Sequence, residues 1–313
     1  GGAQSDNDTV TITVNAVNDN PVHTVPGGQS TNEDGTLTFS SGNGNLISVA
    51  DVDAASSSVQ VTLTSTNGTA TLSGTSGLTF SSGDGSADAS MVFTGSLTNI
   101  NSTLAGMTFA PTANFNGSGS VQIQTSDQGN TGSGGAQSDN DTVTITVNAV
   151  NDNPVLAGVE GSTLAYTEGD AASTISASVT TADVDDTQIE NATVQITTNL
   201  DNTEDVLAFT NQNGITGSFT ASTGLMTLSG TASLANYETA LRAVTYQNTN
   251  TDNPTTSTRM VTFTINDGTG DSNTQTRAIS INALNDSPVL AGVAGSTLAY
   301  TEGDAASTIS ASV

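Results

Sequence analysis

The feature that most constrains this chain is an internal repeat about as long as one ordinary domain. Residues 1–22 recur without a change as residues 134–155, 133 positions later. Residues 156–179 recur as residues 290–313 with a single substitution. A period of this length is typical of one compact domain, so the sequence predicts a tandem array rather than one large fold.

Two complete units and two partial ones follow from this repetition. Each new unit begins at a proline that comes directly after an Asn-Asp-Asn or Asn-Asp-Ser segment. Proline fixes an extended entry and removes a backbone donor, which suits a short linker between domains. We therefore expect a C-terminal fragment of a preceding repeat, two complete repeats and an N-terminal fragment of a following repeat, at residues 1–20, 21–153, 154–287 and 288–313. On this interpretation the chain is an excerpt of a longer array.

Short runs in which apolar and polar residues alternate predict strands in both units. Such alternation places the apolar side chains on one face of a strand, and Gly, Asn, Ser and Asp between the runs favour turns. The predicted strands are residues 59–65, 69–73, 91–94, 119–125, 141–148, 193–198, 224–229, 259–265 and 276–282. Residues 96–104 and 233–241 are each expected to form a short helical turn. The sequence thus predicts an all-β fold of tandem antiparallel β-sandwich domains arranged end to end.

The chain is a strong polyanion. Its 313 residues include 3 basic and 30 acidic residues, so the formal net charge is −27. A nucleic-acid partner is excluded because phosphate binding needs clustered basic residues, and the basic residues here are only Arg242, Arg259 and Arg277. No apolar run is long enough to span a membrane, so direct membrane insertion of this segment is not expected. Self-repulsion opposes compaction and bound cations relieve it, which makes calcium the leading candidate ligand.

Acidic residues concentrate at the two ends of each unit. The shared pattern is an early Glu, an Asp-x-Asp pair and a late Asp, namely Glu33, Asp51, Asp53 and Asp127 in the first unit and Glu168, Asp183, Asp185 and Asp267 in the second. Residues i and i+2 of an extended strand point to the same side, so Asp183 and Asp185 can direct two carboxylates at one point. Calcium binds about six to eight oxygens from carboxylates, amides and carbonyls, and the Asn-Asp linkers supply more of them.

This order of motifs resembles the cadherin superfamily, and more closely the cadherin-like repeats of very large bacterial surface proteins. The matching segments are the linker Asn151-Asp152-Asn153-Pro154, then Glu168-Gly169, Asp183-Val184-Asp185 and Asp267-Gly268. Two features depart from the family pattern. Ala16 and Ala149 stand where the family linker has its first aspartate, and the mid-domain Asp-Arg-Glu is missing from the first unit. Fewer or weaker calcium ions at each junction than in vertebrate cadherins are therefore expected.

The resemblance implies immunoglobulin- or cadherin-like sandwiches whose calcium sites are shared by neighbouring repeats. The implied ligands at the central junction are Glu33, Asn151, Asp152, the carbonyl of Asn153, Asp183, Asp185 and Asp267. Those at the N-terminal junction are Asn18, Asp19, Asp51, Asp53 and Asp127. The corresponding positions toward the last linker are Glu168, Asn285 and Asp286. The implied partners are neighbouring repeats of the same chain and other copies in a fibre or matrix.

Each motif also has a purely structural interpretation. A lone Asp-x-Asp pair is most often a turn, because Asp bonds to its own backbone, and only the repetition of the whole pattern favours calcium. Asp84 and Asp201 lack such partners and are interpreted as turn residues. His23 is predicted to be a surface residue rather than a ligand or a base. The tyrosines are expected in the core rather than in a sugar-binding platform.

The sequence does not predict an enzyme. It has no cysteine, no lysine and one histidine, and its paired carboxylates recur at the linkers rather than in the single cleft that a glycosidase needs. The function favoured by the sequence is a calcium-stiffened structural segment of a secreted adhesin or fibre, extracellular at the bacterial cell surface, that serves cell adhesion or a biofilm scaffold. Two alternatives stay open, namely repeats that themselves bind a glycan or a like repeat on another cell, and a filament subunit completed by strand exchange. Aromatic residues at 4% disfavour glycan binding.

Overall fold

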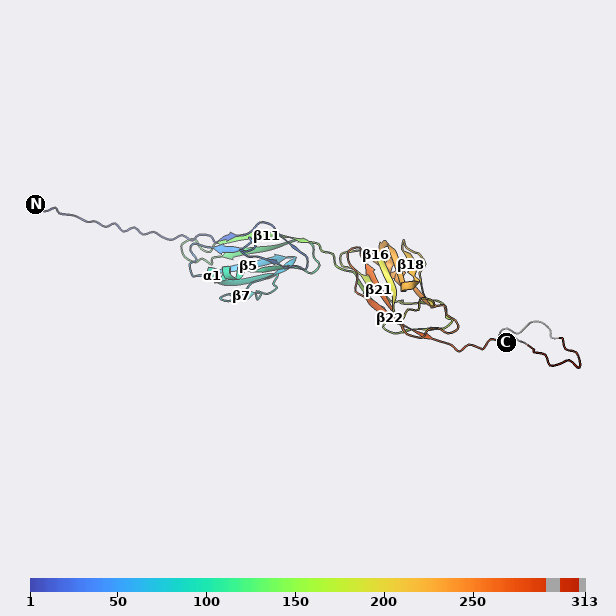
Figure 1. The fold of residues 1–313 in the computed structure, drawn as a ribbon. Coiled ribbons are helices and arrows are strands. Elements are labelled where there is room, and N and C mark those ends of the chain that lie inside the picture. Colours follow the sequence, from blue (N-terminus) through green and yellow to red (C-terminus); the bar gives the residue numbers. More distant parts are fainter. Residues whose placement is uncertain (291–298, 310–313) are drawn as a thin grey trace. The chain divides into compact units, whose positions relative to one another are not determined.

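The computed structural model describes residues 1–290 and 299–309. The chain divides into two compact units, Gly1–Val150 and Asn151–Val313, whose elements are labelled in Figure 1. The division falls directly before the linker that begins at Asn151. The fragment of a following repeat predicted at residues 288–313 lies partly outside the described residues.

The first unit contains eleven strands and one helix. In chain order these are β1 (Val22–Thr24), β2 (Gln29–Asn32), β3 (Leu37–Thr38), β4 (Ser48–Ala50), β5 (Ser58–Thr66), β6 (Gly68–Thr71), β7 (Thr79–Ser82), β8 (Ser90–Ser96), α1 (Leu97–Leu104), β9 (Thr108–Pro111), β10 (Gly117–Ser126) and β11 (Ser138–Asn148). A six-stranded sheet has the order β2-β11-β10-β5-β8-β7, and a three-stranded sheet has the order β3-β9-β6. The short strands β1 and β4 form a separate pair.

The second unit repeats this plan. Its elements are β12 (Val155–Ala157), β13 (Leu164–Thr167), β14 (Ser173–Thr174), β15 (Thr180–Ala182), β16 (Gln188–Thr198), β17 (Asp205–Ala208), β18 (Thr216–Thr220), the 3₁₀ turn η1 (Ala221–Thr223), β19 (Leu225–Ser233), α2 (Leu234–Arg242), β20 (Thr245–Asn248), β21 (Arg259–Asn266) and β22 (Gln275–Asn282). The sheets have the orders β13-β22-β21-β16-β19-β18, β14-β20-β17 and β12-β15. The topology of the two units is therefore the same.

One strand pair in each large sheet is parallel. β2 runs parallel to β11, and β13 runs parallel to β22, whereas the other strand pairs of these sheets are antiparallel. The prediction of all-β sandwiches is confirmed, but each large sheet contains one parallel pair and is not wholly antiparallel. The difference arises because the second strand of each unit joins the sheet edge beside the last strand and runs in the same direction.

Period-two alternation builds the core of each unit. Along β5, Val59, Val61 and Leu63 are buried, while the residues between them are partly exposed. These side chains belong to one core with Phe39 and Phe109 from the smaller layer. The second unit has an equivalent core of its own. Burial of these apolar faces between two layers is the main stabilising contribution to each sandwich.

The two short helices lie where the sequence predicts them. Ser96 caps α1 by accepting a hydrogen bond from Asn99 N, and Ser233 caps α2 by accepting one from Asn236 N. The predicted long strands are likewise present. The short strands β1–β4 and β12–β15 were not predicted, because two to four residues are too few to show a clear alternation.

The two terminal segments reproduce parts of the repeat. Residues 5–15 have the same sequence as β11, in which Val143, Ile145 and Val147 are buried. The equivalent side chains at the N-terminus are exposed, namely Val10, Ile12 and Val14. Near the C-terminus, Tyr300 donates a hydrogen bond to Asp304 O, as Tyr166 does to Asp170 O. Tyr166, Tyr237 and Tyr246 are in the core as predicted, whereas Tyr300 is 58% exposed.

Candidate metal centre

A cluster of polar side chains gathers at the start of the second unit. Asn151 Nδ2 donates a hydrogen bond of 2.9 Å to Asp267 Oδ2, which joins the linker to the turn after β21. Asp152 N lies 3.2 Å from Asp185 Oδ2, which joins the linker to the turn after β15. Carboxylate oxygens of Asp183, Asp185 and Asp186 all lie within 4.8 Å of one another. The linker is therefore held between two acidic turns.

The first unit has the same contacts at five corresponding residues, although Ala54 stands where the second unit has Asp186. Asn18 Nδ2 donates a hydrogen bond to Asp127 Oδ2, and Asp19 N donates one of 2.6 Å to Asp53 Oδ2. Asp51 Oδ1 accepts from Asp53 N at 2.9 Å. Each of the five contacting residues matches its counterpart in residue type as well as in contact. The arrangement is therefore built into the repeat.

A turn alone does not account for the first aspartate of each Asp-x-Asp pair. Asp183 Oδ1 accepts from Asp185 N and Asp186 N, at 3.2 and 3.0 Å, as an Asx turn requires. Its other oxygen, Oδ2, is buried without a hydrogen-bond partner, and Asp51 Oδ2 is in the same state. An unpaired buried acceptor costs about 1–3 kcal/mol, more when charged, and a cation is one partner that would fit the same orphan oxygen in both units.

The aspartates of a pair lie in a turn rather than on an extended strand. β15 ends at Ala182, and β4 ends at Ala50, so each pair follows its strand directly. The sequence-based expectation of a continuous strand was wrong here, because the carboxylate of the first aspartate bonds to the backbone ahead of it. The turn still brings the two carboxylates of a pair together.

The protonation equilibria of the cluster reflect this crowding. Burial raises the pKa of Asp183, and the neighbouring carboxyl group of Asp185 raises it further. Burial also acts to raise the pKa of Asp267, but hydrogen bonds from Asn151, Gly270 and Thr269 outweigh it, so the pKa is lowered. Asp127 likewise has a lowered pKa, because bonds from Gly129, Gln137 and Asn18 outweigh its burial. A cation beside Asp183 would favour its charged form.

The early glutamates lie where the chain leaves each unit. Glu33 Oε1 accepts a hydrogen bond of 2.6 Å from Val150 N, and Glu168 Oε2 accepts one of 2.8 Å from Leu284 N. Both residues are buried, and Glu168 Oε1 has no hydrogen-bond partner. Asn285 Nδ2 lies 3.4 Å from Asp286 O in the next linker. Sharing of an ion between neighbouring repeats stays a prediction.

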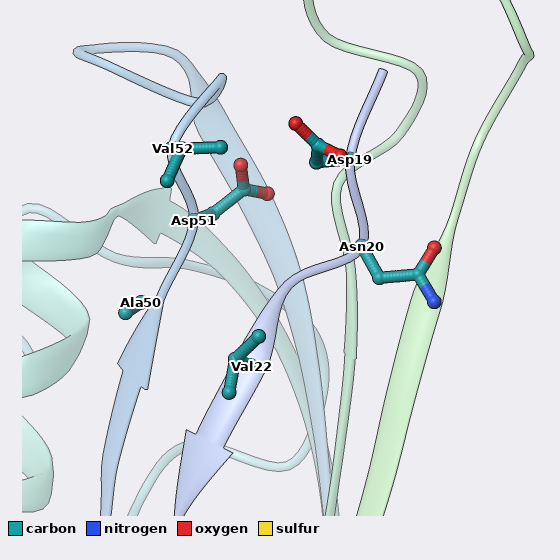
Figure 2. Close-up of a pocket in the computed structure, with 6 residues that line it drawn as sticks. All are labelled: Asp19, Asn20, Val22, Ala50, Asp51 and Val52. Atoms are coloured by element: carbon teal, nitrogen blue, oxygen red, sulfur yellow. The ribbon is translucent and has the colours of Figure 1, made fainter. Parts of the chain in front are cut away.

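A hollow of about 390 Å³ adjoins the cluster of the first unit and is lined by Asp19, Asn20, Val22, Ala50, Asp51 and Val52. Figure 2 shows the side chain of Asp51 extending toward the segment that carries Asp19. The side chain of Asn20 extends to the opposite side of that segment. In the second unit, the equivalent Asn153 packs against Gly270, where a β-carbon would lie 2.0 Å from Asn153 Oδ1. Asn153 therefore fits closely against its own unit, whereas a hollow adjoins Asn20.

The prediction that His23 is a surface residue was wrong. Its side chain is fully buried, and its ring lies between Thr125 and two aspartates, Asp139 and Asp141. His23 faces inward on β1. The prediction rested only on its place shortly after a linker proline, which does not show the direction of the side chain. The available signal was Asp139 and Asp141 themselves, because period two places them on the same face of β11 as the buried Val143.

A buried ionic network in the second unit was also missed. Arg259 Nε lies 2.9 Å from Asp205 Oδ2, and Arg259 Nη2 lies 2.9 Å from Glu204 Oε1. Tyr246 donates a hydrogen bond of 2.6 Å to Asp205 Oδ1. Asp201 is a turn residue as predicted, with Oδ1 accepting from Thr203 N. The network joins β17, β20 and β21 inside the second unit.

Within residues 1–290 and 299–309, no helix has both the length and the apolar character needed to cross a membrane. No protein-family model matches the chain. A local sequence similarity links it to halomucin of Haloquadratum walsbyi, at 37% identity over 110 residues. That match covers 34% of this chain and 1% of halomucin, so the chain spans a very small part of its relative.

A comparison with solved structures finds matches at low TM-scores. Extracellular cadherin domains 1–5 of protocadherin gamma B2 match at 13% identity and a TM-score of 0.32, over 87% of this chain and 42% of that one. Mouse cadherin-23 EC22–24 matches at 12% identity and a TM-score of 0.31, over 85% of this chain and 67% of that one. The C-terminal domain of the Streptococcus agalactiae AgI/II polypeptide BspA matches at 11% identity and a TM-score of 0.24, over 83% of this chain and 99% of that one. At these low scores, the all-β sandwich fold rests on the strand order and cores of the chain itself.

Proposed function

We propose that this chain is a segment of tandem calcium-binding repeats in a secreted cell-surface adhesin or extracellular fibre. The observation that carries the proposal is the duplicated polar cluster with its unpartnered, buried oxygens of Asp51 and Asp183. The same orphan atom occurs in both repeats, so it belongs to the repeated motif rather than to the packing of one unit. A cation that each copy binds explains both.

The donor atoms in these clusters favour calcium over other metals. The residues that would hold it in the second unit are Asn151, Asp152, Asn153, Asp183, Asp185 and Asp267, and those in the first are Asn18, Asp19, Asp51, Asp53 and Asp127. All of them offer oxygen, without a histidine or a thiolate, and calcium accepts a large and irregular set of oxygens. When bound, the ion supplies positive charge that offsets the repulsion among the carboxylates and fixes the linker against its own repeat.

The shared use of ions by neighbouring repeats is the structural part of the proposal. Glu33 would contribute from the repeat before the central linker, and Glu168 would contribute in the same way with Asn285 and Asp286. Repeats would then run from Pro21 to Asn153 and from Pro154 to Ser287. An ion held from both sides limits bending at a linker, so the array would act as a stiff spacer. The net charge of −27 favours bound cations. The local similarity to halomucin supports an extracellular setting.

The N-terminal copy of β11 supports the array. Val10, Ile12 and Val14 form an apolar stripe and are 84%, 80% and 88% exposed. The equivalent residues of the identical sequence in β11, Val143, Ile145 and Val147, are buried. Such a stripe needs a sheet to cover it. In the array, the large sheet of a preceding repeat would cover this stripe. In a second candidate function, a filament subunit, another copy of the chain would cover it by strand exchange. Gel filtration separates the two, because strand exchange makes oligomers that persist when calcium is chelated.

Calcium-dependent stability of the second unit tests the proposal. The chain has no tryptophan, and its 4 tyrosines all lie after residue 151, so tyrosine fluorescence reports unfolding of the second unit. A site with a Kd near 10⁻⁴ M contributes about 2.7 kcal/mol of unfolding free energy in about 10 mM calcium. Asp183→Asn with Asp185→Asn should remove this increment while preserving size and turn propensity.

The matched control removes the same charge elsewhere. Glu190→Gln with Asp252→Asn also deletes two carboxylates of the second unit, and neither residue belongs to the cluster. We expect the control to keep the calcium-induced rise in melting temperature in full. Equal calcium responses in the wild type, the cluster variant and the control would mean that the aspartates of the pair are turn residues only.

A further inference from the structure

We propose that His23, Asp139 and Asp141 form a second kind of metal site, selective for a zinc-class divalent transition ion and distinct from the calcium clusters. His23 lies on β1, and both aspartates lie on β11 of the first unit. His23 Nδ1 is 3.5 Å from Asp139 Oδ2 and 3.3 Å from Asp141 Oδ2. One imidazole nitrogen and two carboxylates thus face a common point.

The histidine nitrogen in this group has no hydrogen-bond partner. The His23 side chain is 0% exposed, and Nδ1 is buried without a bond to any described residue. The other ring nitrogen, Nε2, lies 2.8 Å from Thr125 Oγ1. With the Nε2 proton donated to Thr125, the Nδ1 lone pair faces the two carboxylates. Three electron-rich groups so arranged need a positive charge between them, which either a proton on Nδ1 or a metal cation supplies.

The distances fit a tetrahedral ion. Zinc binds histidine nitrogen and carboxylate oxygen at about 2.0–2.2 Å, so neighbouring ligand atoms around a tetrahedral ion lie about 3.3–3.5 Å apart. The two observed separations, 3.3 and 3.5 Å, fall at these values. An N–H group donating to one carboxylate would instead approach that oxygen to about 2.7–2.9 Å. The near-equal spacing therefore favours a metal over a direct ion pair.

Hydrogen bonds from the surrounding structure orient the three side chains, and the site is open to solvent on one side. His23 N donates a hydrogen bond of 2.8 Å to Asp139 Oδ2, which fixes that carboxylate. The Thr125 hydroxyl orients the imidazole from its far side, as an outer partner of a ligating histidine does. The aspartate side chains are 33% and 40% exposed, so an ion can enter and a water can take the fourth position.

The second unit shows the same framework without these ligands. Leu156 N donates to Asn273 Oδ1 at 2.8 Å, just as His23 N donates to Asp139. The position two residues after Asn273 is Gln275, where the first unit has Asp141. Leucine, asparagine and glutamine therefore serve the fold at these places. The His, Asp and Asp of the first unit are additions beyond what the strand pairing needs.

Zinc titration of the full chain by calorimetry tests the site. Excess calcium is present throughout, so that zinc does not compete for the oxygen-only clusters. Whether those clusters bind calcium is measured separately, by the calcium-dependent melts described above. We expect one zinc ion to bind per chain, and cobalt to bind with the intense visible absorption of a tetrahedral complex. His23→Leu, which copies the second unit, should abolish both signals. Asp139→Asn and Asp141→Gln should each weaken binding strongly.

Two further variants make the result specific. Thr125→Val keeps the shape but removes the outer hydrogen bond, so affinity should fall about 10–100-fold. Asp6→Asn with Asp8→Gln changes the identical Ser-Asp-Asn-Asp sequence at the N-terminus, where no histidine lies across, and should change nothing. Asp141→Gln is the variant to rely on should His23→Leu fail to fold, because Asp141 is partly exposed.

Three results would overturn the proposal. One is zinc binding that is unchanged in His23→Leu or Asp141→Gln. A second is a cobalt spectrum of octahedral type. The third is an absence of zinc binding, in which case nitrogen NMR shifts should show a protonated His23 paired with the aspartates.

Discussion

Replacing Arg259 by methionine should destabilise the second unit severely. Arg259 is 0% exposed, and its Nε and Nη2 atoms bind Asp205 and Glu204, both buried. Its Nη1 donates to Thr255 O and Ser257 O, at 2.6 Å each. Methionine fills most of the space but leaves two buried carboxylates without their cation. Removal of one partner from a buried ion pair costs about 3–5 kcal/mol of unfolding free energy.

The size of the effect is measurable by tyrosine fluorescence. For a unit of this length, about 3–5 kcal/mol lowers the melting temperature by about 6–20 °C. Arg242→Met is the control, because Arg242 is partly exposed and makes an i,i+4 pair with Glu238 and one hydrogen bond to Val179 O, so the loss should be only about 1–2 kcal/mol. Adding Asp205→Asn and Glu204→Gln to the Arg259 variant should recover part of the loss. A loss in Arg259→Met no larger than in the control would refute the reasoning.

Two further predictions concern single features of each unit. Asp51→Asn with Asp53→Asn should abolish the calcium-dependent stabilisation of the first unit in circular dichroism melts, while the tyrosine-reported transition keeps its own calcium response; loss of both responses would contradict separate clusters. Glu160 has its pKa lowered to about 2, because hydrogen bonds from Ser176, Ala177 and Ser178 outweigh its burial. This group stabilises the second unit above pH 4.5, and the contribution of at most about 3 kcal/mol is lost as pH falls toward 2. Glu160→Gln should therefore flatten the acid limb of stability over that range, and an unchanged slope would show that other carboxyl groups produce it.

The long strands and the acidic clusters could be predicted because their signals repeat. Alternation spans the nine residues of β5 and runs from Ala192 to Ile196 in β16, and the Asp-x-Asp pairs recur with their linkers in both units. The two-residue strands β3 and β14 have no such pattern, since their pairing is imposed by the neighbours that cover the core.

The histidine site and the arginine network could not be predicted from one-residue reasoning. His23 meets residues more than 100 positions away, and only the folded sheet brings them together. A polar residue at an inward position of a strand was the usable signal in both cases. Arg259 shares the buried face of β21 with Val261 and Phe263, as Asp141 shares that of β11 with Val143.

The parallel edge pair has a mechanical consequence for each repeat. β2 lies near the start of the first unit and β11 near its end, and the two run side by side in the same direction. A force that pulls the unit by its two ends therefore drags these strands past each other along their length. Their hydrogen bonds are loaded together rather than one after another.

The glutamate at the end of the pair extends this clamp. Glu33 N donates to Asn148 O at 2.9 Å, and Glu33 Oε1 accepts from Val150 N at 2.6 Å, so the exit of the chain is tied to β2 by two more bonds. Glu168 makes the same two contacts with Asn282 O and Leu284 N in the second unit. A repeat held in this way bears tension in shear, so that it yields abruptly at high load instead of unzipping gradually.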